Sequence, residues 1–230
     1  MDDLLDRVRA LKADAKNARD NRNWEEAINY VQEAISLLEA RMANAASLLP
    51  SWLGSQLADS FGLMGGIEKR WGLTSAGQKR QRHLEASVAA YDSGFKYEHK
   101  LQRNEETTYN LVNRLVGRVL LDPSLLQKEG VADSEFSDEL GEAENILTGQ
   151  VESIRQKDPW AYCDLGTIRL LRGEQNALRT FRNLDRLRPP KFVYESTLST
   201  LQPLQEVAAD QRPDLVQAVD QLRRSAGYRE

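Results

Sequence analysis

Apolar residues near the start of the chain recur every three or four positions, which is the spacing of one face of an α-helix. They stand first at Leu4, Val8, Leu11, Ala15 and Ala18. After a polar break over residues 21–23, a second stripe follows at Ala27, Ile28, Val31, Ala34, Ile35, Leu38 and Met42. Two helices joined by so short a turn predict an antiparallel hairpin.

The stretch 58–98 predicts a second hairpin of unusual composition. Its first half is apolar and glycine-rich and is predicted to end as a helix at Gly72. A polar connector rich in Lys and Arg follows, and the helical spacing resumes over residues 84–97. The first hairpin has the spacing of a tetratricopeptide unit, which is ~34 residues long. The second hairpin is longer than such a unit, so we expect an insertion of about ten residues between its helices. Residues 47–55 are predicted to be a partly buried connector.

The rest of the chain continues the helical pattern. A helix beginning near Glu105 and closed by Asp122-Pro123 precedes a polar stretch, residues 124–138, which is predicted to be a mobile loop. Residues 139–157 form the next predicted helix. Asp158-Pro159 marks another helix start, because Asp caps a helix and Pro lacks an N–H that the first turn does not need.

The clearest repeat pattern lies at Ala177, Phe181, Leu184 and Pro189, which match the small, aromatic, apolar and terminating positions of a second repeat helix. Two further amphipathic helices follow. The pattern predicts an all-α fold, a superhelical array of about five helical hairpins like a tetratricopeptide solenoid, which presents a concave binding surface. We expect one domain, residues 1–230, with hairpins at about 1–46, 53–98, 105–157, 158–188 and 191–226.

The overall charge argues against a nucleic-acid partner. Lys and Arg number 31 against 35 acidic residues, and the formal charge is -4, whereas nucleic-acid-binding domains are usually basic. No apolar run approaches the roughly 18 residues of a membrane span, so no membrane contact is predicted. The acidic, amphipathic N-terminus differs from a signal peptide, and a single cysteine, Cys163, is typical of a reduced cytoplasm.

No catalytic, metal or cofactor motif is present in the sequence. The histidines are His83 and His99, and neither an H-E-x-x-H, a C-x-x-C nor an NTPase phosphate loop occurs. Cys163 lies on the apolar side of its predicted helix and is interpreted as a buried small hydrophobe. Because acid–base and nucleophilic chemistry needs partnered residues, we expect a non-enzymatic protein without a cofactor or a metal.

Gly62, Gly65 and Gly66 sit inside a helical pattern, where glycine costs about 1 kcal/mol relative to alanine. Two explanations are open, close approach of a neighbouring helix or approach of a ligand. We favour the first, because a helical repeat needs small residues where its helices cross. Tyr91 is likewise interpreted as a packing residue of its hairpin before a ligand contact.

Candidate binding residues begin at the end of the same apolar helix, with Lys69, Arg70 and Trp71. Arg70 either satisfies the carbonyls at the helix end or binds an anion through its guanidinium. The basic run that follows, Lys79, Arg80, Arg82 and His83, is expected in the connector or at the start of the next helix and is interpreted as a solvated face.

The remaining candidates for ligand or partner binding are Tyr109, Asn110, Asn113, Arg114 and Tyr162. In a stack of hairpins the first helices line the concave face, so Tyr109, Asn113 and Arg114 can project into one groove with Arg70. Asn113 and Arg114 are adjacent, so at most one of them points at the centre of that groove.

Several short stretches keep a recognisable order along the chain. They are Gly65-Gly66-Ile67 with Arg70, Tyr91 with Gly94-Phe95, Tyr109-Asn110-Leu111, Asp158-Pro159-Trp160, Pro189-Pro190 and Tyr194-Glu195-Ser196. In this order they resemble the tetratricopeptide-like TRAF-binding region of the apoptosis-signal-regulating kinases. They are more similar still to the tetratricopeptide sensor domain (TPR-S) of prokaryotic conflict and signalling systems. The resemblance runs from about Ala58 to Ser199.

The resemblance implies a non-enzymatic sensor or adaptor that recognises a nucleotide-derived ligand. It also implies a partner, an effector protein of the peptidase, TIR or kinase type. No effector domain is present in this sequence, so the effector is expected to be a separate protein or to have been cut away. Two hypotheses stay open: a groove that takes a small anionic ligand or a segment of the effector, and a pure protein–protein interaction scaffold with no small ligand.

Overall fold

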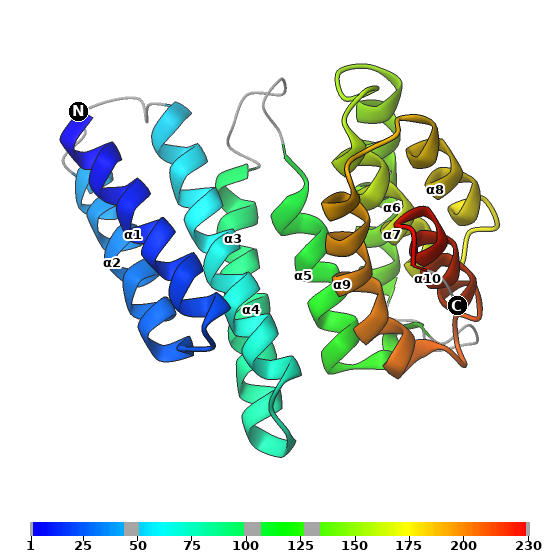
Figure 1. The fold of residues 1–230 in the computed structure, drawn as a ribbon, viewed down its shortest axis with the longest axis horizontal. Coiled ribbons are helices and arrows are strands. Elements are labelled where there is room, and N and C mark those ends of the chain that lie inside the picture. Colours follow the sequence, from blue (N-terminus) through cyan, green and yellow to red (C-terminus); the bar gives the residue numbers. More distant parts are fainter. Residues whose placement is uncertain (1, 44–50, 99–106, 127–133, 229–230) are drawn as a thin grey trace. The chain divides into compact units, whose positions relative to one another are not determined.

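A computed structural model describes residues 2–43, 51–98, 107–126 and 134–228. Within these ranges the chain forms ten α-helices, one short 3-10 helix and no strand (Figure 1). The predicted all-α fold, a helical array, is therefore confirmed. The chain divides into two compact units, Met1–Gly117 and Arg118–Glu230. The expectation that residues 1–230 form a single domain stays a prediction.

The first predicted hairpin consists of α1 (Asp2–Asp20) and α2 (Trp24–Ala43). The apolar stripe of α1 is buried as the spacing predicted, with Val8, Leu11, Ala15 and Ala18 at most 6% exposed. The turn between the helices closes where the N–H of Asn23 donates to the carbonyl of Ala18 at 2.8 Å. One core then continues from α1 and α2 onto the next helix, α3 (Ser51–Leu73).

The second hairpin, α3 and α4 (Gly77–Glu98), corrects two expectations. Its extra length is not an insertion between the helices, because only residues 74–76 join them and the helices themselves have 23 and 22 residues. The basic run over residues 79–83 is not a connector, because it forms the first turns of α4. Apolar spacing does not mark these turns because most of their side chains face solvent. Of the predicted connector 47–55, the part from Ser51 on belongs to α3, and the part before it lies outside the described residues.

Helix α5 (Tyr109–Leu121) ends as predicted, just before Asp122-Pro123, where the 3-10 helix η1 (Pro123–Leu126) begins. Its predicted start near residue 105 lies outside the described residues. The predicted mobile loop, residues 124–138, is partly helical, because η1 reaches into it and α6 starts at Ser134. The middle of that loop, residues 127–133, also lies outside the described residues.

The second unit contains α6 (Ser134–Glu152), α7 (Pro159–Arg172), α8 (Ala177–Arg186), α9 (Lys191–Ala208) and α10 (Asp214–Ser225). The predicted start of α7 is confirmed, because Asp158 accepts a 3.0 Å hydrogen bond from the N–H of Trp160. The predicted repeat positions Ala177, Phe181 and Leu184 are at most 1% exposed. Cys163 is buried too, and its burial raises the pKa of the thiol to about 12.

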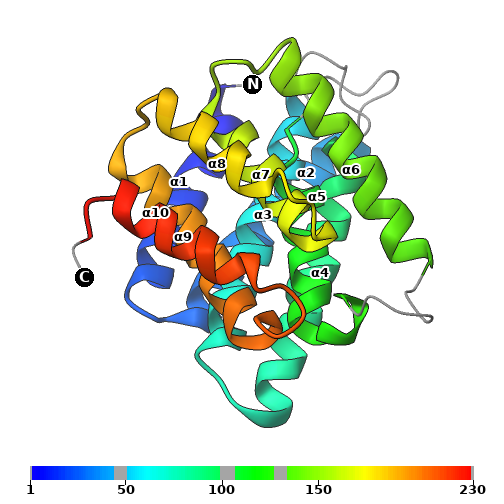
Figure 2. The same cartoon turned by 90° about the vertical axis from the view of Figure 1, so that its right-hand side faces the viewer.

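Polar contacts tie the helices of this unit together. The guanidinium of Arg169 donates to Glu144 on α6 at 2.8 Å and to Thr180 on α8 at 2.9 Å. Arg212 donates to the carbonyl of Leu171 at 3.0 Å, which satisfies an acceptor near the end of α7. Helix α10 packs along α9 and also contacts α8 (Figure 2). Among the helices described in both units, none is both long and apolar enough to cross a membrane.

Candidate functional site

Helix α3 contacts its neighbours α4 and α5 through two of its glycines. A Cβ on Gly65 would lie 2.8 Å from the ring of Tyr91 on α4, and one on Gly62 would lie 3.0 Å from the amide oxygen of Asn110 on α5. Real Cβ atoms essentially never come closer than 3.0 Å to a neighbouring atom, as one on Gly65 would, and the 3.0 Å contact at Gly62 is tighter than nine in ten real ones. The interpretation of these two glycines as packing positions is therefore confirmed.

Gly66 has a different environment from the other two glycines. A Cβ there would meet only two hydroxyl oxygens, those of Tyr91 and Tyr109, each at 3.6 Å. The two tyrosine rings meet edge to face, with their centroids 5.9 Å apart. The missing side chain of Gly66 thus leaves space beneath a pair of phenol groups.

The Tyr91 side chain is fully buried, as its packing role predicted. Its hydroxyl oxygen nevertheless has no partner in hydrogen-bond geometry among the described residues. Burial, and then the neighbouring Tyr109, raise the pKa of Tyr91 well above its ordinary value. The group is therefore a neutral donor whose neighbour is another neutral phenol, and an anion would accept a stronger, charge-assisted hydrogen bond from it.

Lys69 places a positive charge next to these phenols. Its side chain is 9% exposed, its ammonium donates to Oδ1 of Asn113 at 2.7 Å, and it stands 5.9 Å from the centroid of the Tyr91 ring. Within the part of the chain that the structure describes, no carboxylate lies within 4.0 Å of it. Burial, and then repulsion by Arg70, lower the pKa of Lys69 to about 8.

Arg70 is half-exposed and only loosely neutralised. Its guanidinium stands 3.7 Å from Asp20, a carboxylate that Arg19 already holds at 2.8 Å. Burial, and then Arg19, lower the pKa of Arg70. Two arginines thus share one carboxylate, and a positive charge remains at the end of α3.

The other candidates divide between this site and other roles. Asn113 belongs to the site through Lys69, while Arg114 turns to Asp92 at 3.2 Å and stacks over Phe95. The two adjacent side chains thus have different partners, and the expectation about the centre of the groove stays a prediction.

Asn110 serves to anchor α5. Its amide nitrogen donates to the carbonyl of Ala58 at 3.0 Å and to Glu98 at 2.8 Å. Tyr162 belongs to the second unit, where its hydroxyl donates to the carbonyl of Gln156 at 3.1 Å.

Trp71 lies in an aromatic stack beside the site. His83 stacks on it at 3.8 Å, Trp24 at 6.5 Å, and the ammonium of Lys79 stands 4.9 Å from its ring. Trp24, Trp71 and Lys79 border a hollow of about 390 Å³ at the start of α2. The interpretation of His83 as part of a solvated face is wrong, because it is 4% exposed and bonds Glu68 at 2.7 Å.

The resulting site, which we call the Gly66 site, consists of Lys69, Arg70, Tyr91, Tyr109 and Asn113 around Gly66. It offers an ammonium, a guanidinium and phenol hydroxyls, and Asp20, the carboxylate beside Arg70, is shared with Arg19. Such a set of donors is suited to an anion. Sequence reasoning missed the polar part of Tyr91, because the repeat pattern explains its ring and says nothing of its hydroxyl.

Among the described residues, no three His, Cys, Asp or Glu side chains gather closely enough to hold an ion.

Comparison with known families agrees with this architecture. The model of the family described as Tetratricopeptide Repeats-Sensor matches residues 1–121, which include every residue of the Gly66 site. The motifs from Asp158 onward lie beyond the matched residues. Neither the curated proteins nor the solved structures gave a match. Because the match spans more than half of the 230 residues, the chain belongs to the Tetratricopeptide Repeats-Sensor (TPR-S) family.

Proposed function

We propose that this protein is a non-catalytic sensor that binds a small anion in the Gly66 site. The observation that carries the proposal is the ammonium of Lys69, which is buried and donates to the neutral amide of Asn113. A buried charge is costly unless an opposite charge and hydrogen bonds compensate it. An anion bound at Lys69 supplies both.

Each residue of the site has a separate part in this binding. Arg70 is half-exposed, and its guanidinium can give two parallel hydrogen bonds to a phosphate or carboxylate. Tyr91 gives a buried, neutral donor, and Tyr109 is 47% exposed at the entrance. Gly66 leaves the space that an anion needs to reach both hydroxyls.

A sensor must also transmit the binding event, and the contact of Lys69 offers a route. Asn113 lies on α5, so an anion that draws the ammonium toward itself weakens a contact that holds α5 on α3. A ligand shifts an equilibrium by the difference in its affinity for the two states. We propose that the displaced state of α5 is the one that an effector protein recognises.

The family resemblance indicates what this system contains. It implies an effector of the peptidase, TIR or kinase type in a bacterial defence or signalling system, and nucleotide-derived molecules are the anions it suggests first. The predicted concave groove, and the cytoplasmic location, stay predictions beside this proposal.

Calorimetric titration of the whole chain with phosphate, pyrophosphate, nucleotides and cyclic nucleotides tests the proposal. We expect at least one of them to bind, and Arg70→Ala or Lys69→Met to weaken it by about tenfold or more, the value of one charge-assisted hydrogen bond. Binding should also weaken as the pH rises through about 8, where Lys69 loses its proton.

Arg82→Ala is the matched control, because Arg82 is an exposed basic residue on the neighbouring α4. It should leave the affinity nearly unchanged. Failure of every anion to bind, or equal losses in the control and in the Arg70 variant, would count against the Gly66 site.

The second candidate function is a protein-interaction scaffold with no small ligand. The observation that favours it is a pair of aromatic rings on the second unit, Trp160 and Phe192, which are 38% and 58% exposed with centroids 6.0 Å apart. Aromatic residues of this kind are typical anchors of protein interfaces. A scaffold should retain a partner from its source cell without added metabolite, and it should lose that partner when both rings are replaced by serine.

A further inference from the structure

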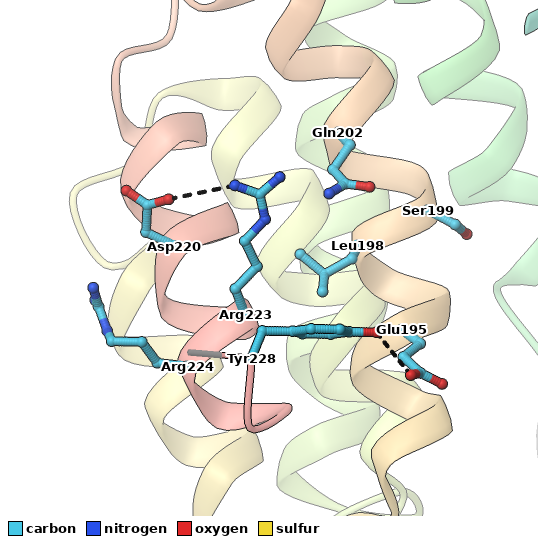
Figure 3. A pocket seen from close by; sticks show the side chains of 8 residues that line it. All are labelled: Glu195, Leu198, Ser199, Gln202, Asp220, Arg223, Arg224 and Tyr228. Atoms are coloured by element: carbon cyan, nitrogen blue, oxygen red, sulfur yellow. Dashed lines mark hydrogen bonds and ion pairs between the residues drawn. The ribbon is translucent and has the colours of Figure 1, made fainter. Parts of the chain in front are cut away.

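A pocket of about 560 Å³ lies between α9 and α10 in the second unit (Figure 3). Its volume falls within the roughly 300–1,000 Å³ of small-molecule sites. Leu198, which is 5% exposed, lies at the centre, and Tyr228, Arg223 and Gln202 surround it (Figure 3). The pocket therefore has an apolar floor and polar walls.

Tyr228 forms one wall, although it is 46% exposed. Gly227 has a φ of 81°, and the N–H of Tyr228 donates to the carbonyl of Arg223 at 3.0 Å, so the chain turns back after α10. The hydroxyl of Tyr228 then donates to Glu195 at 2.8 Å, and the ammonium of Lys191 stands 4.6 Å from its ring. These contacts from α9 hold an aromatic face in place beside Leu198 before any ligand arrives.

Arg223 forms the opposite wall and is poorly neutralised. Its guanidinium stands 4.0 Å from Asp220, and both side chains are exposed, so the pair contributes little to stability. Figure 3 shows this guanidinium between Asp220, to which a dashed line joins it, and Gln202, which also lines the pocket. Arg223 can therefore exchange Asp220 for a carboxylate of a ligand at little cost.

The charges around the pocket favour an anion at the Arg223 end. Glu195 does not oppose one, because Lys191 bonds it at 3.2 Å and Tyr228 donates to it. The hydrogen bond from Tyr228, and then Lys191, lower the pKa of Glu195. The remaining charged residues that line the pocket are Asp220 and two arginines, Arg223 and Arg224, so the arginines outnumber the carboxylate.

We propose that this pocket is a second binding site, for a small carboxylate that carries an aromatic or branched aliphatic body. The carboxylate bonds Arg223 and the amide of Gln202, and the body lies on Leu198 against the face of Tyr228. The site is independent of the Gly66 site, which lies in the other unit and is suited to an anion without an apolar body.

Titration of the whole chain with phenylacetate tests this site. We expect saturable binding, with phenylacetamide and acetate each weaker by about tenfold or more, because one lacks the charge and the other lacks the ring. Arg223→Gln should weaken phenylacetate by about tenfold or more, which is the loss of one charge-assisted hydrogen bond. Tyr228→Ala should also weaken it, because it removes the wall.

Arg182→Gln removes the same charge from an exposed position of α8 that does not line the pocket. It should change the affinity by less than about twofold, as expected for an exposed charge without contact to the ligand. Lys69→Met should have no effect, which separates this site from the Gly66 site. Equal binding of phenylacetamide, an Arg223→Gln variant that binds like the wild type, or no saturable binding of phenylacetate would each overturn the proposal. Thermal unfolding of each variant checks that it is folded.

Discussion

The ammonium of Lys69 and the amide oxygen of Asn113 meet at 2.7 Å, although 44 residues separate them in the chain. The contact joins α3 to α5 and does so through a neutral acceptor. An aspartate at the same place would have closed the site with an ion pair. An asparagine instead leaves the charge of Lys69 available to a ligand, at a cost to the free protein.

That cost should be visible in the pH dependence of stability. The pKa of Lys69 is lowered from 10.5 in the unfolded chain to about 8 in the folded one. Between these values the unfolded state holds a proton that the folded state has released, so the free energy of unfolding rises with pH. Lys69→Met should remove this rise, whose size is up to about 3 kcal/mol.

Urea unfolding of the wild type and the variant across pH 8 to 10.5 measures the difference in slope. Lys16→Met, a change at an exposed lysine of α1, is the control and should retain the wild-type slope. Parallel curves for the wild type and Lys69→Met would show that the ammonium is not buried as described.

Neighbouring glycines of α3 should respond oppositely to alanine. Gly65→Ala should destabilise the protein by roughly 1–3 kcal/mol, because the new methyl group overlaps the Tyr91 ring. In Gly66→Ala the new methyl group makes only ordinary van der Waals contacts. The higher helix propensity of alanine should therefore raise the free energy of unfolding by up to about 1 kcal/mol. It should still weaken anion binding, because the methyl group occupies the space below the two hydroxyls.

Thermal unfolding and anion titration of both variants separate these effects. Each serves as the control for the other, since both place a methyl group on the same helix one residue apart. If Gly66→Ala bound anions as tightly as the wild type, the space at Gly66 would have no role in binding.

Glu98 predicts a dependence on acid pH. Its Oε1 accepts from Thr107 at 2.7 Å and from the amide of Asn110 at 2.8 Å, while its buried Oε2 has no partner among the described residues. Burial raises the pKa of Glu98 from 4.5 to about 6. Since the folded state binds the extra proton, stability falls as the pH rises from 4.5 to 6, and the loss persists at pH 7.

Glu98→Gln keeps an acceptor for Asn110 and removes the charge. The difference in free energy of unfolding between this variant and the wild type should increase by about 1–2 kcal/mol in favour of the variant across that range, and it should be constant at higher pH. Glu85→Gln, at an exposed position of the same helix, should follow the wild type. A constant difference at all pH values would mean that Glu98 ionises normally in the folded protein.

Local signals in the sequence predicted the elements that depend on neighbours in the chain. The cap of Asp158 and the buried stripe of α1 are examples, because a hydrogen bond two residues away and a helical period need no tertiary information. His83 could not be placed this way. Its burial results from contacts with Glu68 and Trp71 on α3. Its neighbours in the sequence are charged, so the local pattern indicated an exposed residue.

The candidate sites show the same division. Lys69 and Arg70 could be named from the sequence because two cations flank a tryptophan at a helix end. The surroundings of the Tyr91 hydroxyl depend on which atoms α5 brings near it, and periodicity carries no such information. The pocket beside Tyr228 depends on a turn after α10 that folds one ring onto α9, and no pattern in the sequence predicts that contact.

The four tryptophans are divided unequally between the units. Trp24, Trp52 and Trp71 lie in the first unit, and Trp160 stands alone in the second. After Trp160→Phe, all tryptophan fluorescence comes from the first unit, while circular dichroism still reports every helix. Coincident melting of the two signals would mark one cooperative domain, and separate midpoints would mark two, so the chain carries its own optical test of how its halves unfold.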